Sequence, residues 1–308
     1  MATVLSIVTA FRNQYDYNRL FLENVFKYTG DLGELIAVDN GSADESGELF
    51  KSYGAQVIRN HDNCNYSVAM NQGSGRASGR FICHINNDVI VGPHWSEILI
   101  ENLNCGGWDF VSPSSIELMP TYDASKQARK RWSRIQQELS SSSRNHPEEA
   151  WRKMYPRWKE FCEAHRKRYH GRCLRAINGH TVLMTRDAWK CFGGYDERNV
   201  ASDWDLFVRS SIEEMDGGNL KAPRVCFAAY VHHFMGATTR AQGGKTLWAN
   251  DSQQHQGLTE KWPMAVLKQH WWNPMDLTPT PTPSREPLLY AKYAIKRVLG
   301  LYQWGDEF

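Results

Sequence analysis

One apolar stretch that breaks into three polar side chains does most to limit what this chain can fold into. Residues 81–85 (FICHI) suit a buried strand, and Asn86, Asn87 and Asp88 follow before the apolar residues 89–91 (VIV). Asn86 and Asp88 lie on either side of Asn87 and can point the same way. Ligands of open α/β sheets bind beyond the carboxyl ends of the strands, and hard divalent cations prefer oxygen ligands. The stretch therefore predicts a ligand site at a strand end, with a simple turn as the alternative.

The motifs around this stretch have the order and spacing of a known family. A first strand at residues 5–9 (LSIVT) is followed by residues 37–44 (AVDNGSAD), 65–73 (NYSVAMNQG) and 86–88 (NND). In these pieces the chain resembles the family-two glycosyltransferases of the GT-A fold, although its triplet begins with Asn where many members have Asp. The resemblance is specific up to about residue 112 and patchier beyond it. It implies an α/β fold with a Rossmann-like mixed sheet of GT-A type flanked by helices.

The resemblance also implies an activity, the inverting transfer of a sugar from a nucleotide-diphosphate donor with Mn²⁺ or Mg²⁺ at the diphosphate. Asp39 ends the second expected strand, in the place of the family's acid for the nucleoside, and Asp88 is in the place of its metal anchor. The alternative for Asp39 is a brace for a turn that precedes a helix capped by Ser42. Phe11 by itself is more typical of a core. The residues expected to contact the donor are Thr9, Phe11, Arg12, Asp39, Asn40, Asn71, Asn86 and Asn87.

The second half of the chain contributes a candidate general base. After residues 192–197 (FGGYDE), the segment 202–205 (SDWD) stands where the family has Glu-Asp-x-Asp. Ser202 replaces the family's Glu, and Asp203 takes the place of the base that accepts a proton from the acceptor hydroxyl. The alternative is a capping box of Ser202 and Asp205 at a helix start. The residues expected on the acceptor side are Gly179, His180, Trp204 and Asp205.

A histidine at the end of a late strand is the second candidate metal ligand. The expected strand at residues 225–231 ends in His232 and His233. His233 matches a family histidine in a His-x-x-Gly segment that reaches the metal or the diphosphate, so Asp88 and His233 are the expected metal ligands. A mixture of carboxylate and imidazole slightly favours Mn²⁺ over Mg²⁺. A structural role for a histidine at a strand end is the alternative.

A basic segment separates the two halves. Residues 125–175 hold fifteen Lys or Arg and five Glu, a charge of about +10 that leaves about −8 for the rest of the chain. Two polar helices are expected, separated by residues 140–143 (SSSS) and with aromatic side chains among the charges. A polyanionic acceptor is one explanation, either a membrane-associated glycan or a nucleic acid such as viral DNA with hydroxylated bases, and the aromatics would stack on its sugars or bases. The other is a solvated helical hairpin whose aromatics pack on the main domain.

Length and composition suit one large domain with an insertion and a tail. A chain of 308 residues with 41% hydrophobic residues can bury a full core. We expect a nucleotide-sugar-binding half at 1–112, the basic helical insertion at 113–176, an acceptor and catalytic half of the same domain at 177–272, and a Pro/Thr-rich linker with a C-terminal helix at 273–308.

Neither an apolar run near 18 residues nor an N-terminal leader is found, which predicts a cytoplasmic protein, free or peripheral at a membrane surface. The seven cysteines are scattered and never spaced as Cys-x-x-Cys, so neither a disulfide framework nor a zinc site is expected.

Two other functions stay open. Asn86 and Ser202 suggest a nucleotide-sugar or polyanion binding module that has lost turnover. A nucleotidyltransferase shares the acid and metal chemistry, but residues 10–13 (AFRN) lack the Gly-rich phosphate loop of that class. The oligomeric state stays open as well.

Overall fold

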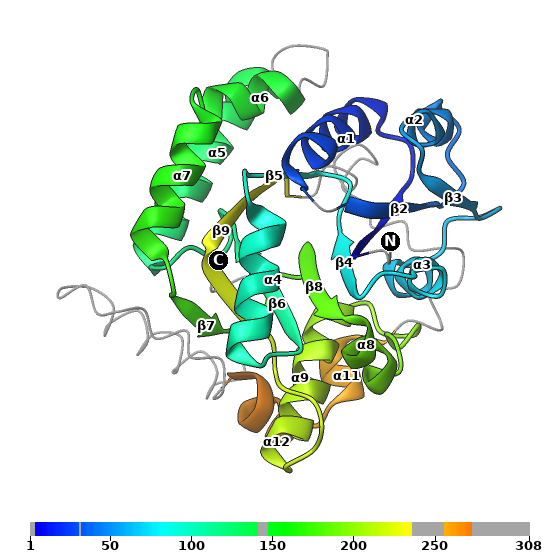
Figure 1. Ribbon diagram of the computed structural model, residues 1–308, viewed down its shortest axis with the longest axis vertical. Helices are drawn as coiled ribbons and strands as arrows, with labels where there is room; N and C mark the ends of the chain where they lie inside the picture. The colour runs from blue at the N-terminus through cyan, green and yellow to red at the C-terminus, as the bar shows by residue number, and fades with distance from the viewer. Residues whose placement is uncertain (1–3, 31, 141–146, 236–255, 273–308) are drawn as a thin grey trace.

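The fold is taken from a computed structural model that describes residues 4–30, 32–140, 147–235 and 256–272 (Figure 1). The linker and helix predicted at 273–308 lie outside the described residues. Within the described part of the chain, no helix is long and apolar enough to cross a membrane.

A mixed sheet of nine strands forms the centre of the molecule (Figure 1). The strands are β1 Leu5–Phe11, β2 Leu32–Asp39, β3 Gln56–Arg59, β4 Phe81–Ile85, β5 Val89–Val91, β6 Phe110–Ser114, β7 Cys173–Arg175, β8 Thr181–Thr185 and β9 Arg224–His233. Their order is β3-β2-β1-β4-β8-β6-β9-β5, and β7 pairs with β9 outside this path. The first four strands of this order are parallel, whereas β8 runs antiparallel to β4 and β6. Because β8 and β9 come from the second half, both halves build one sheet.

Helices cover both faces of this sheet (Figure 1). They are α1 Tyr15–Tyr28, α2 Ser46–Ser52, α3 Tyr66–Ser74, α4 Trp95–Gly106, α5 Tyr122–Ser140, α6 Pro147–Met154, α7 Trp158–Tyr169, α8 Arg186–Phe192, α9 Ser202–Met215, α11 Leu258–Lys261, α12 Met264–Leu267 and the π-helix η1 Lys268–Trp272. In β1, Ile7 packs with α1, α2 and α4, whereas its neighbour Val8 packs with α3, α8 and α9. Neighbouring residues of a strand point to opposite faces, so a strand buried on both sides must be apolar throughout.

The polar triplet after β4 is a turn between two strands. The backbone N–H of Val89 donates to the carbonyl oxygen of Asn86 at 3.2 Å and closes it. The chain then continues as β5, which pairs antiparallel with the end of β9 and sets Val89 opposite His233. The sequence left a turn and a ligand site as alternatives. In the structure this segment is a turn, and the turn also places Asp88 at the end of β9.

The described residues of the basic insertion form three helices, where the sequence predicts two. α7 packs on β9, and α6 lies against α1 and α5. The rings of Trp132, Tyr155 and Trp158 are buried in one cluster with Tyr230 and Phe234 of the main domain. Rings buried in this way offer no surface for stacking. For these three aromatics the expected stacking on an acceptor is therefore wrong, and packing on the main domain is the correct explanation.

Candidate active site

Strand pairing brings the two expected metal ligands together. Because Val89 lies opposite His233, Asp88 comes to rest beside the His233 ring. Asp88 Oδ1 is 3.3 Å from His233 Nε2. The backbone N–H of Phe234 also donates to the carbonyl oxygen of Asp88 at 3.0 Å, which ties the triplet to the end of β9.

Two further side chains join this pair. Glu117, in the loop after β6, places Oε1 2.5 Å from His233 Nδ1. His180, just before β8, has Nε2 3.9 Å from Glu117 Oε2. One possible ligand atom from each of Glu117, His180 and His233 lies within 4.8 Å of the others, as in a site for one metal ion. We call Asp88, Glu117, His180 and His233 the strand-end cluster.

Sequence reasoning missed half of this cluster. It places His180 on the acceptor side, and it does not single out Glu117 at all. The one available signal is that Glu117 follows the end of a buried strand, as Asp88 does. Nothing local indicates that the two strand ends meet at the same point.

The strand-end cluster has the charges and donors of a cation site. Removal from water opposes a charge on His233, but Asp88 and Glu117 outweigh it and raise the pKa of the imidazole to about 10. Burial likewise opposes ionisation of Asp88 and Glu117, and His233 nevertheless lowers both pKa values. Burial lowers the pKa of His180 to about 4, so this ring is neutral at pH 7. Among the described residues, its Nε2 atom is buried without a hydrogen-bond partner. Ionised carboxylates with the neutral imidazole of His180 fit a divalent metal, and a metal bound to His233 must first displace the proton of that ring.

Asp203, the candidate general base, lies beside the residue that precedes His180. It is in the first turn of α9, beside Gly179, where a Cβ atom would overlap the Asp203 carboxylate. Partial burial raises the pKa of Asp203, and hydrogen bonds from the backbone N–H groups of Trp204 and of Asp203 itself partly offset this; none of the described cations contributes. Gly179 directly precedes His180, so the carboxylate lies one residue along the chain from the strand-end cluster.

The other acid of the motif has a structural role instead. Asp205 is fully buried and accepts hydrogen bonds from Lys261 Nζ at 2.9 Å and from Trp262 Nε1 at 2.7 Å. Trp204 packs edge-on against Trp271, with 5.2 Å between the ring centroids. Both residues therefore attach the segment at 258–272 to α9, and their place on the acceptor side stays a prediction.

The start of α9 also excludes the capping box. The N-cap residue is Ala201, whose side chain makes no capping hydrogen bond. Ser202 and Asp205 both lie inside the helix. The capping box of Ser202 and Asp205 is therefore wrong.

The tip of β2 braces its own loop. Asp39 is fully buried, and its carboxylate accepts hydrogen bonds from the Ser42 backbone N–H at 2.7 Å and from Arg59 Nη1 at 2.7 Å. Asn40 is held in the same way by Asn60, at 2.9 Å. Asp39 therefore braces its turn, as the alternative interpretation predicts. The half-exposed Arg59 side chain is the part of this corner that solvent reaches. A contact of Asp39 or Asn40 with a nucleoside stays a prediction.

Three other donor candidates are occupied by the protein itself. The buried ring of Phe11 stacks on Phe50, with 4.3 Å between the centroids, and belongs to the core. The Asn87 amide donates to Asn18 Oδ1 at 2.7 Å and so faces α1. Asn71 Oδ1 accepts a hydrogen bond from the Tyr195 backbone N–H at 2.9 Å, and its amide nitrogen donates to the Tyr195 carbonyl oxygen at 3.0 Å. In the structure, Phe11 therefore packs in the core, whereas the side chains of Asn71 and Asn87 join two segments of the chain by hydrogen bonds.

The remaining three are open to a ligand. Thr9 Oγ1 and Arg12 Nε, at the end of β1, are buried atoms without a hydrogen-bond partner in the part of the chain that the structure describes. Asn86 is partly exposed. Buried polar atoms without a partner are uncommon in native proteins, and a bound donor is one way to satisfy them.

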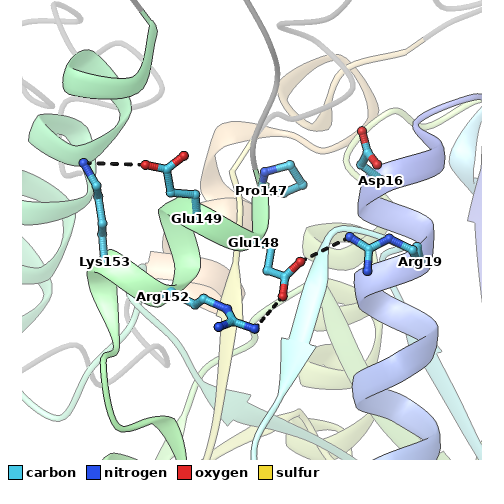
Figure 2. Close-up of a pocket in the computed structure, with 7 residues that line it drawn as sticks. All are labelled: Asp16, Arg19, Pro147, Glu148, Glu149, Arg152 and Lys153. Atoms are coloured by element: carbon cyan, nitrogen blue, oxygen red, sulfur yellow. Dashed lines mark hydrogen bonds and ion pairs between the residues drawn. The ribbon is translucent and has the colours of Figure 1, made fainter. Parts of the chain in front are cut away.

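A charged cleft of about 620 Å³ lies apart from these residues, between α1 and α6 (Figure 2). Glu148 bridges it, at 3.2 Å from Arg19 and 2.7 Å from Arg152. Exposed ion pairs of this kind each contribute about 0–1 kcal/mol. No member of the strand-end cluster lines this cleft. The cleft lies where α6 of the insertion meets α1. Its lining residues are Asp16, Arg19, Pro147, Glu148, Glu149, Arg152 and Lys153.

Comparisons with known proteins point in one direction. The family model described as Glycosyl transferase family 2 matches residues 6–159. Glycosyltransferase GlyG of Streptococcus pneumoniae is 29% identical over 108 residues, which are 33% of this chain and 36% of that protein. Putative glycosyltransferase EpsH of Bacillus subtilis is 30% identical over 100 residues, 31% of this chain and 29% of that protein. These matches thus span about a third of the length of each curated relative.

One solved structure shares the fold. GalNAc-T7, crystallised with UDP, GalNAc and Mn²⁺, superposes with a TM-score of 0.50 and 13% identity, over 75% of this chain and 43% of that one. At this identity the likeness concerns the fold alone, a mixed sheet flanked by helices.

Proposed function

Because the chain belongs to glycosyl transferase family 2, we propose that it transfers a sugar from a nucleotide-diphosphate donor to an acceptor hydroxyl with inversion. The contact between Asp203 and Gly179 carries this proposal, since it places a carboxylate that no described cation pairs with beside the residue that precedes His180 of the strand-end cluster. Such a transfer needs a base for the acceptor and positive charge at the donor's diphosphate. The GT-A type fold expected for this family is confirmed.

The strand-end cluster is the proposed site of the cation, Mn²⁺ or Mg²⁺. Two carboxylates, the neutral imidazole of His180 and, once its proton is displaced by the metal, the imidazole of His233 make a mixed donor set that favours Mn²⁺. The buried Nε2 atom of His180, which has no hydrogen-bond partner among the described residues, supports this assignment. A cation bound there stabilises the negative charge of the departing nucleoside diphosphate. The Mn²⁺ and UDP bound in GalNAc-T7, which shares the fold, are consistent with such a site.

Asp203 is the proposed base. A carboxylate whose pKa is raised by partial burial holds a proton more tightly than an ordinary one, which improves it as a base. It accepts the proton of the acceptor hydroxyl while that oxygen attacks the anomeric carbon and the diphosphate leaves from the opposite side. No covalent intermediate with the protein is formed.

The test of this function is the release of nucleoside diphosphate from a panel of nucleotide sugars, with Mn²⁺, with Mg²⁺ and with a chelator. Release that requires a divalent cation, and that is lost in Asp203→Asn, supports the transferase. Donor binding without release in the wild type indicates the inactive binding module that Asn86 and Ser202 suggest. Release of pyrophosphate from a nucleoside triphosphate and a sugar phosphate indicates a nucleotidyltransferase.

Replacing Glu117 with Gln is expected to weaken Mn²⁺ binding about 10–100-fold, the range found for partners of metal-binding histidines. The change removes a negative charge that both His233 Nδ1 and the Ser115 hydroxyl contact, at 2.5 Å and 2.6 Å. Calorimetric titration of the protein with Mn²⁺ measures the effect. The matched control is Glu160→Gln on the exposed side of α7, which should bind Mn²⁺ as the wild type does. Equal Mn²⁺ affinity in both variants would remove Glu117 from the site.

For the acceptor we propose a polyanionic, membrane-associated glycan that the basic insertion recognises. With its largest rings buried, the insertion presents mainly charge. Lys126, Lys130 and Arg134 are exposed and lie four residues apart in α5, so they share one face of the helix. Such a face attracts polyanions. DNA with hydroxylated bases is the other candidate, and the burial of the aromatics weakens it, because exposed rings are what stack on unpaired bases.

Neutralising this face with Lys126→Gln, Lys130→Gln and Arg134→Gln is expected to weaken binding to vesicles of anionic lipid about 100-fold at low salt. Each basic residue near such a surface contributes about 1 kcal/mol. Co-sedimentation across a range of salt concentrations measures it. The control removes three exposed charges elsewhere, with Lys27→Gln, Lys51→Gln and Lys190→Gln, and should bind like the wild type.

Duplex DNA is the second arm of that experiment. Binding to DNA that weakens steeply with salt, and that the α5 variant loses, would favour the nucleic acid as acceptor. If the wild type binds neither polyanion at low salt, the insertion is only a solvated set of helices.

A further inference from the structure

Two cysteines face each other across the pairing of β7 with β9. The register sets Cys173 directly opposite Cys226. At the next position, the Phe227 backbone N–H donates to the carbonyl oxygen of Arg172 at 2.9 Å. Hydrogen-bonded and non-hydrogen-bonded pairs alternate along an antiparallel ladder, so Cys173 and Cys226 form a non-hydrogen-bonded pair, with Cα atoms typically about 4.5 Å apart. This separation lies within the range of disulfides, about 4.4–6.8 Å.

The two thiols have different surroundings. Cys226 is buried, whereas Cys173, on the short strand β7, is partly exposed. A hydrogen bond from the Cys226 thiol lowers the pKa of Cys173 against the effect of burial, and the nearby Arg224 lowers it further. The same contact, together with burial, raises the pKa of Cys226. A partly exposed thiol whose pKa is lowered, next to a buried thiol whose pKa is raised, is the arrangement of an attacking and a resolving cysteine.

We propose that Cys173 and Cys226 are an oxidation site, at which hydrogen peroxide converts the two thiols into a disulfide. The Cys173 thiolate attacks one peroxide oxygen, the O–O bond breaks, and Cys173 becomes a sulfenic acid while hydroxide leaves. The Cys226 sulfur then attacks the Cys173 sulfur. The S–S bond forms, the S–O bond breaks, and the hydroxyl group leaves as water with the proton of Cys226. The two thiols lose two electrons in total, and one peroxide is reduced to two molecules of water.

The disulfide ties the basic insertion to the sheet. β7 follows α7 directly, and β9 carries His233 at its other end. The bond closes a long loop of chain between residues 173 and 226, which restricts the unfolded chain and raises stability. This inference is independent of the proposed sugar transfer, since it needs neither donor nor cation.

Exposure alone predicts a different outcome. Cys105 and Cys191 are the exposed cysteines, and neither has another cysteine opposite it in the sheet. If access governed oxidation, these two would react first. If the pairing governs it, the disulfide between Cys173 and Cys226 forms before they are modified.

The experiment treats the full chain with limiting hydrogen peroxide, blocks the remaining thiols with an alkylating agent, and maps the peptides without reductant. The expected product is a peptide pair joined through Cys173 and Cys226, with Cys105 and Cys191 still alkylated. The melting temperature should rise by about 5–10 °C and return to its original value with dithiothreitol. In Cys226→Ala, dimedone should trap a sulfenic acid on Cys173.

Two results would overturn the inference. One is oxidation of Cys105 or Cys191 while Cys173 stays alkylated. The other is that only disulfides between separate molecules form. Both are read from the wild-type protein, so they do not depend on the folding of the Cys226→Ala variant.

Discussion

Asp203→Asn is expected to lower the turnover number about 10²–10⁴-fold while donor binding stays nearly unchanged, the size typical of losing a general base. The reason is geometric, because the Asp203 carboxylate lies against Gly179, the residue before His180, and no described cation holds it in place. Release of nucleoside diphosphate gives the rate, and calorimetric titration with the donor gives the affinity. Unchanged turnover would exclude Asp203 as the base.

The pKa shift adds a pH dependence and a stability effect. Since partial burial raises the pKa of Asp203, the rate should fall as the pH decreases through a value above about 3.9, the ordinary value for Asp. A carboxyl whose pKa is raised by folding binds its proton more tightly in the folded chain, so its ionised form lowers stability once the pH exceeds that pKa. Asparagine carries no charge. At pH 7 Asp203→Asn should therefore melt at the wild-type temperature or above it.

The matched control is Asp205→Asn, two residues away in the same helix turn. Asp205 accepts hydrogen bonds from Lys261 and Trp262, and an asparagine amide cannot accept both. We expect a loss of about 1–3 kcal/mol in the free energy of unfolding, as for other buried groups left without a partner. A melting curve beside the rate assay thus separates the two acids, with activity lost in one variant and stability lost in the other.

Asp88→Ala is expected to abolish metal-dependent donor binding and leave the fold intact. The side chain sits on a turn between β4 and β5 and contacts His233, so it contributes a charge to the strand-end cluster and little packing. Titration with a nucleotide sugar, with and without Mn²⁺, measures the metal-dependent part of the affinity. Persistence of that part in the variant would contradict the assignment of Asp88.

The neighbouring Asn87 provides its control. Asn87 is buried and donates to Asn18 Oδ1 at 2.7 Å, away from the cluster. Asn87→Ala should cost about 1 kcal/mol of stability, the usual contribution of one hydrogen bond, and should keep metal-dependent donor binding.

Local patterns in the sequence account for the fold and for part of the candidate site. The apolar runs that become β1, β2 and β4 must be buried on both faces, which requires helices on both sides of the mixed sheet. The polar residues that follow β4 and the histidines at the end of β9 stand out because they interrupt such runs. This much depends on residues that are close together in the chain. The sequence by itself therefore determined the mixed sheet and pointed to Asp88 and His233 in the strand-end cluster, whereas Asp203 was proposed as the base from the family resemblance.

Which polar residues are free to act was decided only by the tertiary structure. Asp203 and Asp205 have the same chemistry and nearly the same position, but Lys261 and Trp262 hold one of them and no described cation holds the other. Glu117 reaches His233 because β6 and β9 are neighbours in the sheet. In the insertion, packing on the main domain likewise buries Trp132, while the charged side chains beside it face solvent. The physical reason is common to all three, since the partners of a buried polar or aromatic group come from segments far away in the sequence.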